Sequence, residues 1–250
     1  MMNIIPFFII SVLAIFLGQI VSHLNKKLPP VVEEKISYKE FFESLKSDFK
    51  IDYKYSIIFI IIFNLLMYFV GNNVTTYLYS IIVFALAIVC SIDIRFRLIP
   101  DEVHVIILIV GIINFILNIN MWWNFILGAA IGGGIFYGLG LLSILIFKKE
   151  GMGFGDVKLM AALGFMFGIK SILVITLVSF VFGAIIGGAL LIIKNKESDG
   201  YIPFGPFIAL GAVIVMFISP DYIIDLYITF CSFIGLKMSD AVYWIMEKFS

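Results

Sequence analysis

The chain has 250 residues, of which 62% are hydrophobic and only 14% charged, and its mean hydropathy is +1.12. A soluble globular protein is about half apolar and about a quarter charged, so these values exclude an ordinary soluble domain and predict a membrane protein. The formal net charge is zero, which argues against a nucleic-acid partner and leaves the lipid bilayer as the expected surroundings.

Eight apolar runs predict an all-α polytopic integral membrane protein with about eight transmembrane helices. The runs are too long for barrel strands, and helices satisfy their own backbone groups in hydrocarbon. Positive charge follows the first run, so the positive-inside rule puts the N-terminus outside. With alternating sides, fourteen of the 17 Lys and Arg residues fall in the cytoplasm, which supports this topology. The runs are 4–21, 55–70, 75–92, 103–118, 122–147, 157–169, 171–193 and 202–219.

The runs divide the chain into a first transmembrane helix (1–22), a cytoplasmic loop (23–54), a membrane-embedded core (55–219) and a C-terminal tail (220–250). Apolar residues at three- and four-residue spacing within 38–49 predict an amphipathic helix on the membrane surface or on the bundle. In the tail, 221–236 is apolar enough to lie on a membrane and 237–250 resembles a short amphipathic helix. Whether the tail spans the membrane or lies on it stays open.

Glycine pairs at four-residue spacing are typical of helices that approach closely in lipid. Such pairs predict a packed bundle and carry no information about chemistry. The pairs are Gly128/Gly132, Gly134/Gly138, Gly164/Gly168 and Gly183/Gly187.

The stretch 150–158 interrupts two long apolar runs with glycines at alternate positions and one carboxylate, Asp156. Gly153 and Gly155 allow positive φ angles, or the close approach of another part of the chain. An ionisable residue at the edge of hydrocarbon suggests a functional site, although an aspartate that caps the next helix would look the same. Lys158 could neutralise Asp156 or meet an acidic group of a substrate, and we favour the former.

A second carboxylate, Asp93, lies where the third expected span meets the cytoplasm, so the topology brings it to the same side as Asp156 at similar depth. Two neighbouring carboxylates do not both ionise, and one keeps a proton near neutral pH. The ionised carboxylate can take a proton from a water that attacks a peptide carbonyl, while the protonated carboxyl donates to the developing oxyanion. The alternative for Asp93 is an interfacial ion pair with Arg95 or Arg97.

Asp101 and Glu102 follow Pro100 at the expected start of a helix, where acidic residues favour the helix dipole. His104 lies one turn beyond Asp101, and we expect it to hydrogen-bond locally. Neither His104 nor His23 has an obvious nucleophile nearby, so covalent catalysis is not indicated.

Three motifs resemble those of one family. Gly153-Phe154-Gly155-Asp156 is the Gly-x-Gly-Asp signature of membrane aspartyl proteases, and the wider stretch 150–164 closely resembles the type IV prepilin peptidase family. Asp93 with the trailing Leu98-Ile99-Pro100-Asp101 resembles the same family. So does 202–207, in which Pro203, Gly205 and Pro206 break the helix before the last span.

The resemblance implies that Asp93 and Asp156 are the catalytic pair, and that Gly153, Gly155, Lys158, Pro203, Gly205 and Pro206 shape the site or bind substrate. It also implies that the chain removes a short basic leader from prepilins and pseudopilins on the cytoplasmic side, after a glycine. The expected location is the inner membrane of a bacterium, with the active-site face in the cytoplasm. The process served would be pilus assembly, secretion or competence.

The loop 23–54 lacks the paired Cys-x-x-Cys motifs with which many family members bind zinc, and the two cysteines of the chain, Cys90 and Cys231, are far apart. We therefore expect no metal and no zinc, and no cofactor for proteolysis. The family's second activity methylates the new N-terminus from S-adenosylmethionine. No glycine-rich nucleotide loop in the sequence decides whether this chain has that activity.

Two other functions remain as alternatives. Presenilin-like and signal-peptide-peptidase-like proteases share Gly-x-Gly-Asp, but they pair it with Tyr-Asp and Pro-Ala-Leu motifs, whereas Ile92 precedes Asp93 here. An ion-coupled transporter could use the same two aspartates as ligands. A transporter would place them near the middle of the bilayer and often shows internal repeats, and the sequence indicates neither feature.

Overall fold

A computed structural model describes residues 4–27, 53–148, 151–193 and 202–249, and these residues form helices and short connections without a strand. The chain divides into two compact units, Met1–Phe217 and Ile218–Ser250. The first unit contains α1 (Ile5–Lys27), α3 (Tyr53–Phe69), α4 (Val74–Phe96), α5 (Asp101–Leu117), the 3₁₀ turn η1 (Ile119–Met121), α6 (Trp122–Phe147), α7 (Phe154–Phe167), α8 (Ile169–Ile193) and α9 (Gly205–Phe217).

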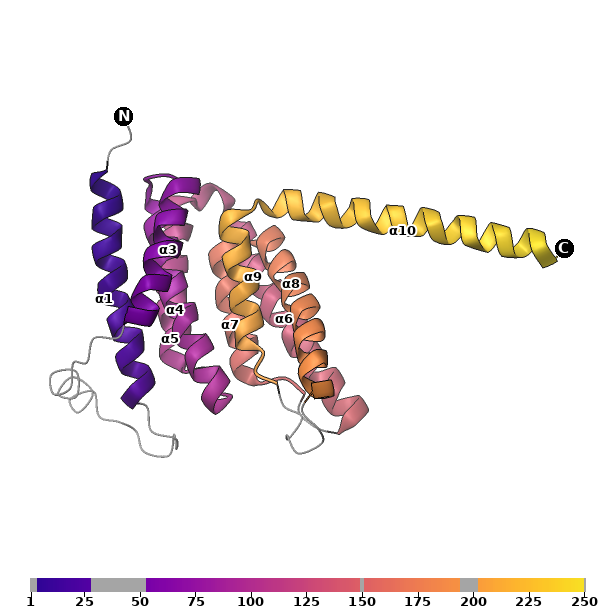
Figure 1. The fold of residues 1–250 in the computed structure, drawn as a ribbon, viewed down its shortest axis with the longest axis horizontal. Coiled ribbons are helices and arrows are strands. Elements are labelled where there is room, and N and C mark those ends of the chain that lie inside the picture. Colours follow the sequence, from indigo (N-terminus) through magenta and orange to yellow (C-terminus); the bar gives the residue numbers. More distant parts are fainter. Residues whose placement is uncertain (1–3, 28–52, 149–150, 194–201, 250) are drawn as a thin grey trace. The chain divides into compact units, whose positions relative to one another are not determined.

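The helices of the first unit lie side by side, and consecutive helices run in opposite directions (Figure 1). Within it, α1 packs on α3, α4 packs on α5 and α9, α7 packs on α5 and α6, and α8 packs on α9. The prediction of an all-α polytopic membrane protein is confirmed. Among the described residues, four helical stretches are long and apolar enough to cross a membrane by themselves: Ile5–Leu24, Val74–Phe96, Ile119–Ile146 and Ile169–Ala189. The count of eight spans and their orientation stay predictions.

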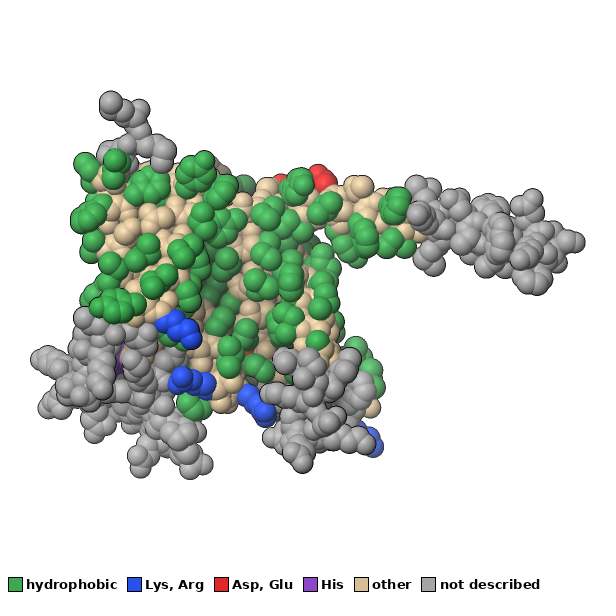
Figure 2. Space-filling model, in the orientation of Figure 1, with side chains coloured by type: hydrophobic (Ala, Val, Ile, Leu, Met, Phe, Trp, Pro, Cys, Tyr) green, Lys and Arg blue, Asp and Glu red, His purple; other side chains and the backbone are tan. Residues whose placement is uncertain are grey.

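Large hydrophobic side chains cover the sides of the first unit, and Lys and Arg side chains gather at one end of it (Figure 2). Ile61, Ile113 and Ile185 are examples of exposed apolar residues, with 55%, 41% and 63% of their surface accessible. An exposed apolar surface of this extent matches lipid rather than water. The charged end is the end at which α4 finishes and α5 and α7 begin.

Local sequence sets the ends of α4 and α5, which bracket the expected site. The Asn73 side chain caps α4 by accepting a hydrogen bond from the Thr76 N–H at 3.0 Å. At the other end Arg97 takes a left-handed conformation (φ 56°) and donates its N–H to the Asp93 carbonyl. Pro100 then precedes the first turn of α5, which carries Asp101 and Glu102 as the helix dipole favours.

Glycines allow α6 and α7 to touch backbone to backbone. A Cβ on Gly164 would clash with the Gly128 carbonyl, and a Cβ on Gly132 would clash with the Met160 carbonyl. The expected role of these glycines in close packing is therefore seen. For Gly134 and Gly138 the expectation is wrong, because a Cβ at either position meets no atom of the described structure within 4 Å.

Two further expectations concern segments outside the core. The amphipathic helix expected within 38–49 lies outside the described residues. The tail was expected as an apolar part, 221–236, and a short amphipathic helix, 237–250, and in the structure both parts lie in one helix, α10 (Pro220–Phe249). Residues 236 and 237 continue the helix because no proline or glycine interrupts it after Gly235.

The glycine contacts generate a test of packing. Gly164→Leu should destabilise the folded protein by about 2 kcal/mol or more, because overpacking forces the α6 and α7 backbones apart. Gly138→Leu is the matched control on open helix surface and should leave stability unchanged or slightly raised. Thermal unfolding in detergent measures both variants. Equal melting temperatures for the two variants would contradict the packing account.

Candidate active site

Asp93 lies in the last turn of α4, and only 4% of its surface is exposed. Its carboxylate oxygen Oδ2 accepts a hydrogen bond of 2.8 Å from the backbone N–H of Gly205, the first residue of α9. Helix N-termini carry free N–H groups and a partial positive charge, so they stabilise carboxylates. The Gly205 N–H is thus the partner that the structure gives to the Asp93 carboxylate.

Gly205 is required at this position by space. A Cβ would stand 2.8 Å from Asp93 Oδ2 and 2.9 Å from Val89 Cγ1, both closer than real Cβ contacts. The preceding Phe204 anchors the segment, with its ring 5.8 Å from that of Phe136 and 5.3 Å from that of Phe180. The break between Pro203 and Pro206 therefore ends with the N-terminus of α9 placed against the carboxylate of α4.

Asp156 lies in the first turn of α7 and is 6% exposed. Its N–H donates to the Gly153 carbonyl at 3.1 Å, which closes the first turn of the helix. The side-chain oxygen Oδ1 is buried and has no hydrogen-bond partner among the described residues. A buried polar atom without a partner is unfavourable for a carboxylate that carries charge.

Asp156 precedes the apolar run 157–169 and lies outside the four helical stretches that could cross a membrane alone. Burial, and next to it the negative charge of Asp93, raise the pKa of Asp156 to about 7, while a backbone hydrogen bond at Gly153 opposes the shift. The two aspartates are thus close enough to interact electrostatically, although 63 positions apart in the sequence. Their catalytic role stays a prediction.

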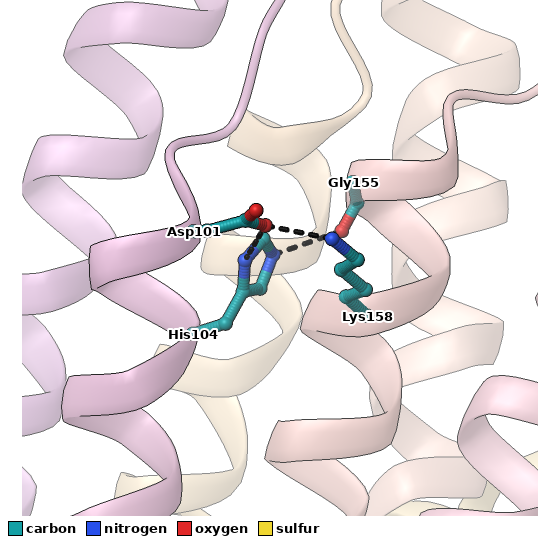
Figure 3. Close-up of polar contacts among 4 residues, drawn as sticks. All are labelled: Asp101, His104, Gly155 and Lys158. Carbon is teal, nitrogen blue, oxygen red and sulfur yellow. Dashed lines mark hydrogen bonds and ion pairs between the residues drawn. The ribbon is translucent and has the colours of Figure 1, made fainter. Parts of the chain in front are cut away.

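Lys158 was expected to neutralise Asp156, but the structure pairs it with Asp101 instead. Its ammonium donates to Asp101 Oδ1 at 2.8 Å (Figure 3). The same ammonium lies 5.3 Å from the centre of the Phe154 ring. Lys158 holds the pKa of the exposed Asp101 below its usual range. The pair joins the first turns of α5 and α7 at the surface of the molecule.

His104 was expected to bond locally, and this expectation was incomplete. Its Nε2 lies 3.0 Å from the carbonyl oxygen of Gly155, 51 positions away, whereas its Nδ1 is 3.5 Å from Asp101 Oδ1 (Figure 3). Sequence reasoning missed this contact because a single histidine in an apolar helix gives no signal of a distant backbone partner.

The glycines before Asp156 do not adopt left-handed conformations. Gly153 has φ −69° and ψ 140°, and Gly155 is not among the positive-φ glycines of the described chain. Gly155 instead permits close approach, since a Cβ there would stand 3.2 Å from the Ile99 Cβ. Of the two roles considered for these glycines, close approach is the one seen at Gly155.

The described residues contain no group of three His, Cys, Asp or Glu side chains that could hold a metal ion. They also give no set of residues that we can assign to S-adenosylmethionine. The expectations for both ligands stay predictions.

Residues 80–188 match the model of the type IV leader peptidase family, and this range includes both Asp93 and Asp156. Several curated proteins named prepilin leader peptidase/N-methyltransferase are similar to the chain. The protein of Xanthomonas campestris is 37% identical over 141 residues, 56% of this chain and 49% of its own length. Those of Pseudomonas aeruginosa and Bacillus subtilis are 36% and 33% identical over 148 and 144 residues, 57% of this chain in both cases and 49% and 56% of their own lengths.

The chain spans about half the length of the curated relatives that it matches. No solved structure matches it. The match favours the prepilin peptidase prediction over the presenilin-like alternative, because the family model that covers both aspartates is that of the type IV leader peptidases. Residues 80–188, which include both aspartates, are thus similar to the type IV leader peptidase family, and the curated proteins that match the chain are named prepilin leader peptidases.

Proposed function

We propose that this chain is an aspartic endopeptidase that removes the short basic leader of type IV prepilins and pseudopilins. The reaction takes place at the cytoplasmic face of a bacterial inner membrane, with Asp93 and Asp156 as the catalytic pair. The observation that carries the proposal is the contrast between two interacting carboxyl groups. Asp93 has a backbone donor at a helix N-terminus, whereas Asp156 has a buried oxygen without a partner and a raised pKa.

The contrast assigns a role to each aspartate. The Gly205 N–H stabilises the ionised form of Asp93 relative to that of Asp156, which has no donor at Oδ1, so we assign Asp93 as the general base. The surroundings of Asp156 favour its protonated form near neutral pH, which makes Asp156 the general acid. A carboxyl pair that shares one proton is the arrangement used by soluble aspartic proteases, and we extend it here by analogy.

The proposed reaction has two steps. In the first step, the oxygen of a water molecule attacks the scissile carbonyl carbon while Asp93 takes a proton from that water. Asp156 gives its proton to the carbonyl oxygen, so that a gem-diol forms. In the second, the C–N bond breaks, the leaving amine receives the proton held by Asp93, and a diol hydroxyl returns a proton to Asp156. Protons and charges balance, and the pair regains its starting state.

The surface near the pair suits a substrate that has an apolar helix after its leader. Ile94 follows Asp93 and is 62% exposed, and Phe154 precedes Asp156 and is 64% exposed. These apolar side chains lie at the charged end of the unit, where a substrate helix in the bilayer would meet a leader in water. The substrate would then enter from the lipid side and place its scissile bond between α4 and α7.

The relatives' names couple the peptidase to an N-methyltransferase. For this chain, methylation of the new N-terminus from S-adenosylmethionine is a separate proposal, and the proteolytic steps do not need it. Cleavage assays with and without S-adenosylmethionine separate the two activities, because proteolysis should proceed at the same rate in both.

Asp93→Asn and Asp156→Asn should each lower leader cleavage by at least about 100-fold, because each removes a group that transfers a proton in the reaction. Folding should persist. An asparagine oxygen at position 93 still accepts from the Gly205 N–H, and a neutral amide at position 156 removes a charge that burial disfavours. The assay is the leader-sized mobility shift of a purified prepilin, alongside thermal unfolding.

Glu102→Gln is the matched control for the dyad variants, since Glu102 is an exposed acidic residue at the same end of the unit. It should cleave at the wild-type rate. If either asparagine variant keeps more than about one tenth of the activity while folded, the two-aspartate mechanism is wrong.

The pH dependence of kcat/KM should show a basic limb that begins near pH 7. The raised pKa of Asp156 means that its proton is present below about pH 7 and lost above it, which leaves two charged carboxylates and no general acid. Glu102→Gln should not move this limb. A kcat/KM that stays constant from pH 6 to pH 9 would contradict the assignment of Asp156 as the acid.

A further inference from the structure

We propose that His104 is a positioning residue, which holds the first turn of α7 through the Gly155 carbonyl and thereby places Asp156 against Asp93. The inference rests on the proposed function for its kinetic consequences. Its geometry stands on contacts that are independent of that function. His104 itself touches neither aspartate in the described contacts.

The bond between His104 and Gly155 has a defined direction. A carbonyl oxygen only accepts, so the Nε2 of His104 carries the hydrogen and donates it across 3.0 Å. The His104 side chain is only 10% exposed, which keeps water from competing for the carbonyl. Gly155 directly precedes Asp156, so a shift of this peptide unit moves the carboxyl with it.

A second contact at Gly155 limits how far the start of α7 can move from the residues that precede α5. Ile99 packs against Gly155 so closely that a Cβ would stand 3.2 Å from the Ile99 Cβ. Ile99 and His104 both belong to the segment that follows Asp93 along the chain, within eleven residues of it. The stretch 93–104 therefore begins with Asp93 and also contacts the start of α7, which carries Asp156.

The start of α7 depends on this outside support. Its N-cap residue, Gly153, has no side chain with which to cap the helix. The Asp101–Lys158 ion pair also links the starts of α5 and α7, but Asp101 and Lys158 are 72% and 41% exposed, and exposed pairs contribute little. The buried His104 bond is thus the polar contact best placed to hold the turn.

Positioning matters for this pair because two proton transfers must be aligned with one water. A displacement of about 1 Å at a catalytic group can lower a rate by about 100-fold. Loss of the His104 bond should therefore reduce kcat while it leaves KM unchanged, since substrate contacts stay in place. If His104 only filled space, a side chain of similar volume without a donor would leave kcat unchanged.

The test compares His104→Leu with His104→Gln in the full chain. Leucine fills the site without a donor, whereas the glutamine amide keeps an N–H that can reach the Gly155 carbonyl. We expect His104→Leu to lower kcat by about 100-fold with KM unchanged, and His104→Gln to restore most of the rate. Both variants should melt near the wild-type temperature.

A second measurement does not need substrate. A hydrophobic carbodiimide modifies buried protonated carboxyls, and mass spectrometry reads its addition to Asp156 as a function of pH. The midpoint of labelling should shift in His104→Leu relative to wild type and return in His104→Gln, because displacement of the turn changes the surroundings of the carboxyl.

The outcomes separate the two proposals. Wild-type protein that cleaves no prepilin would count against the proposed function, and the labelling midpoints would still decide the role of His104. A cleaving wild type with unchanged kcat and midpoint in His104→Leu would overturn the positioning role alone. Equal loss of kcat and of melting temperature in His104→Leu and His104→Gln would also overturn it, because that pattern indicates a structural role.

Discussion

The hydrogen bond from the Gly205 N–H to the Asp93 carboxylate is the interaction on which the rest of the site depends. A carboxylate with 4% of its surface exposed must find a donor inside the protein, since burial without one is strongly unfavourable. The donor comes from a residue 112 positions later, so α4 and α9 must pack together before the site exists. The first turn of α9, which begins between Pro203 and Pro206, supplies the N–H, because backbone N–H groups in a helix are free only in its first turn.

Once Asp93 has this partner, the second aspartate is left in a different environment. Asp156 receives no donor at Oδ1 among the described residues and lies within the field of Asp93. The asymmetry follows from the fold rather than from the side chains, which are chemically the same. It allows one group to accept a proton and the other to donate one, as acid–base catalysis requires.

Much of the fold could be predicted from the sequence, because hydrocarbon allows few alternatives to apolar helices. The run 103–118 became α5, and the run 122–147 became α6 to the residue. Asp93 and Asp156 could also be selected as candidate site residues, since a carboxylate at the edge of an apolar run is rare; their catalytic role stays a prediction. These are local features, and local patterns in the sequence report them well.

The contacts between distant segments could not be predicted in the same way. Lys158 pairs with Asp101 rather than with Asp156, although Asp156 is two positions away, because residues two apart on a helix point in different directions. The His104 contact with Gly155 and the open surface at Gly134 depend on which helix faces lie together. Which helix faces pack together depends on the packing of the whole bundle, and this cannot be predicted from the pattern of a single sequence.

The most direct test of this account measures whether positions 93 and 156 are neighbours in the membrane-embedded protein. Cys90 and Cys231 would be replaced by serine, and Asp93→Cys/Asp156→Cys treated with a short bifunctional thiol reagent. The account predicts an intramolecular cross-link within single chains. It predicts none in Lys170→Cys/Asp156→Cys, because Lys170 lies at the start of α8, beyond the far end of α7. Failure of the 93–156 pair to cross-link, with both thiols open to alkylation, would contradict the claim that the two aspartates form one site.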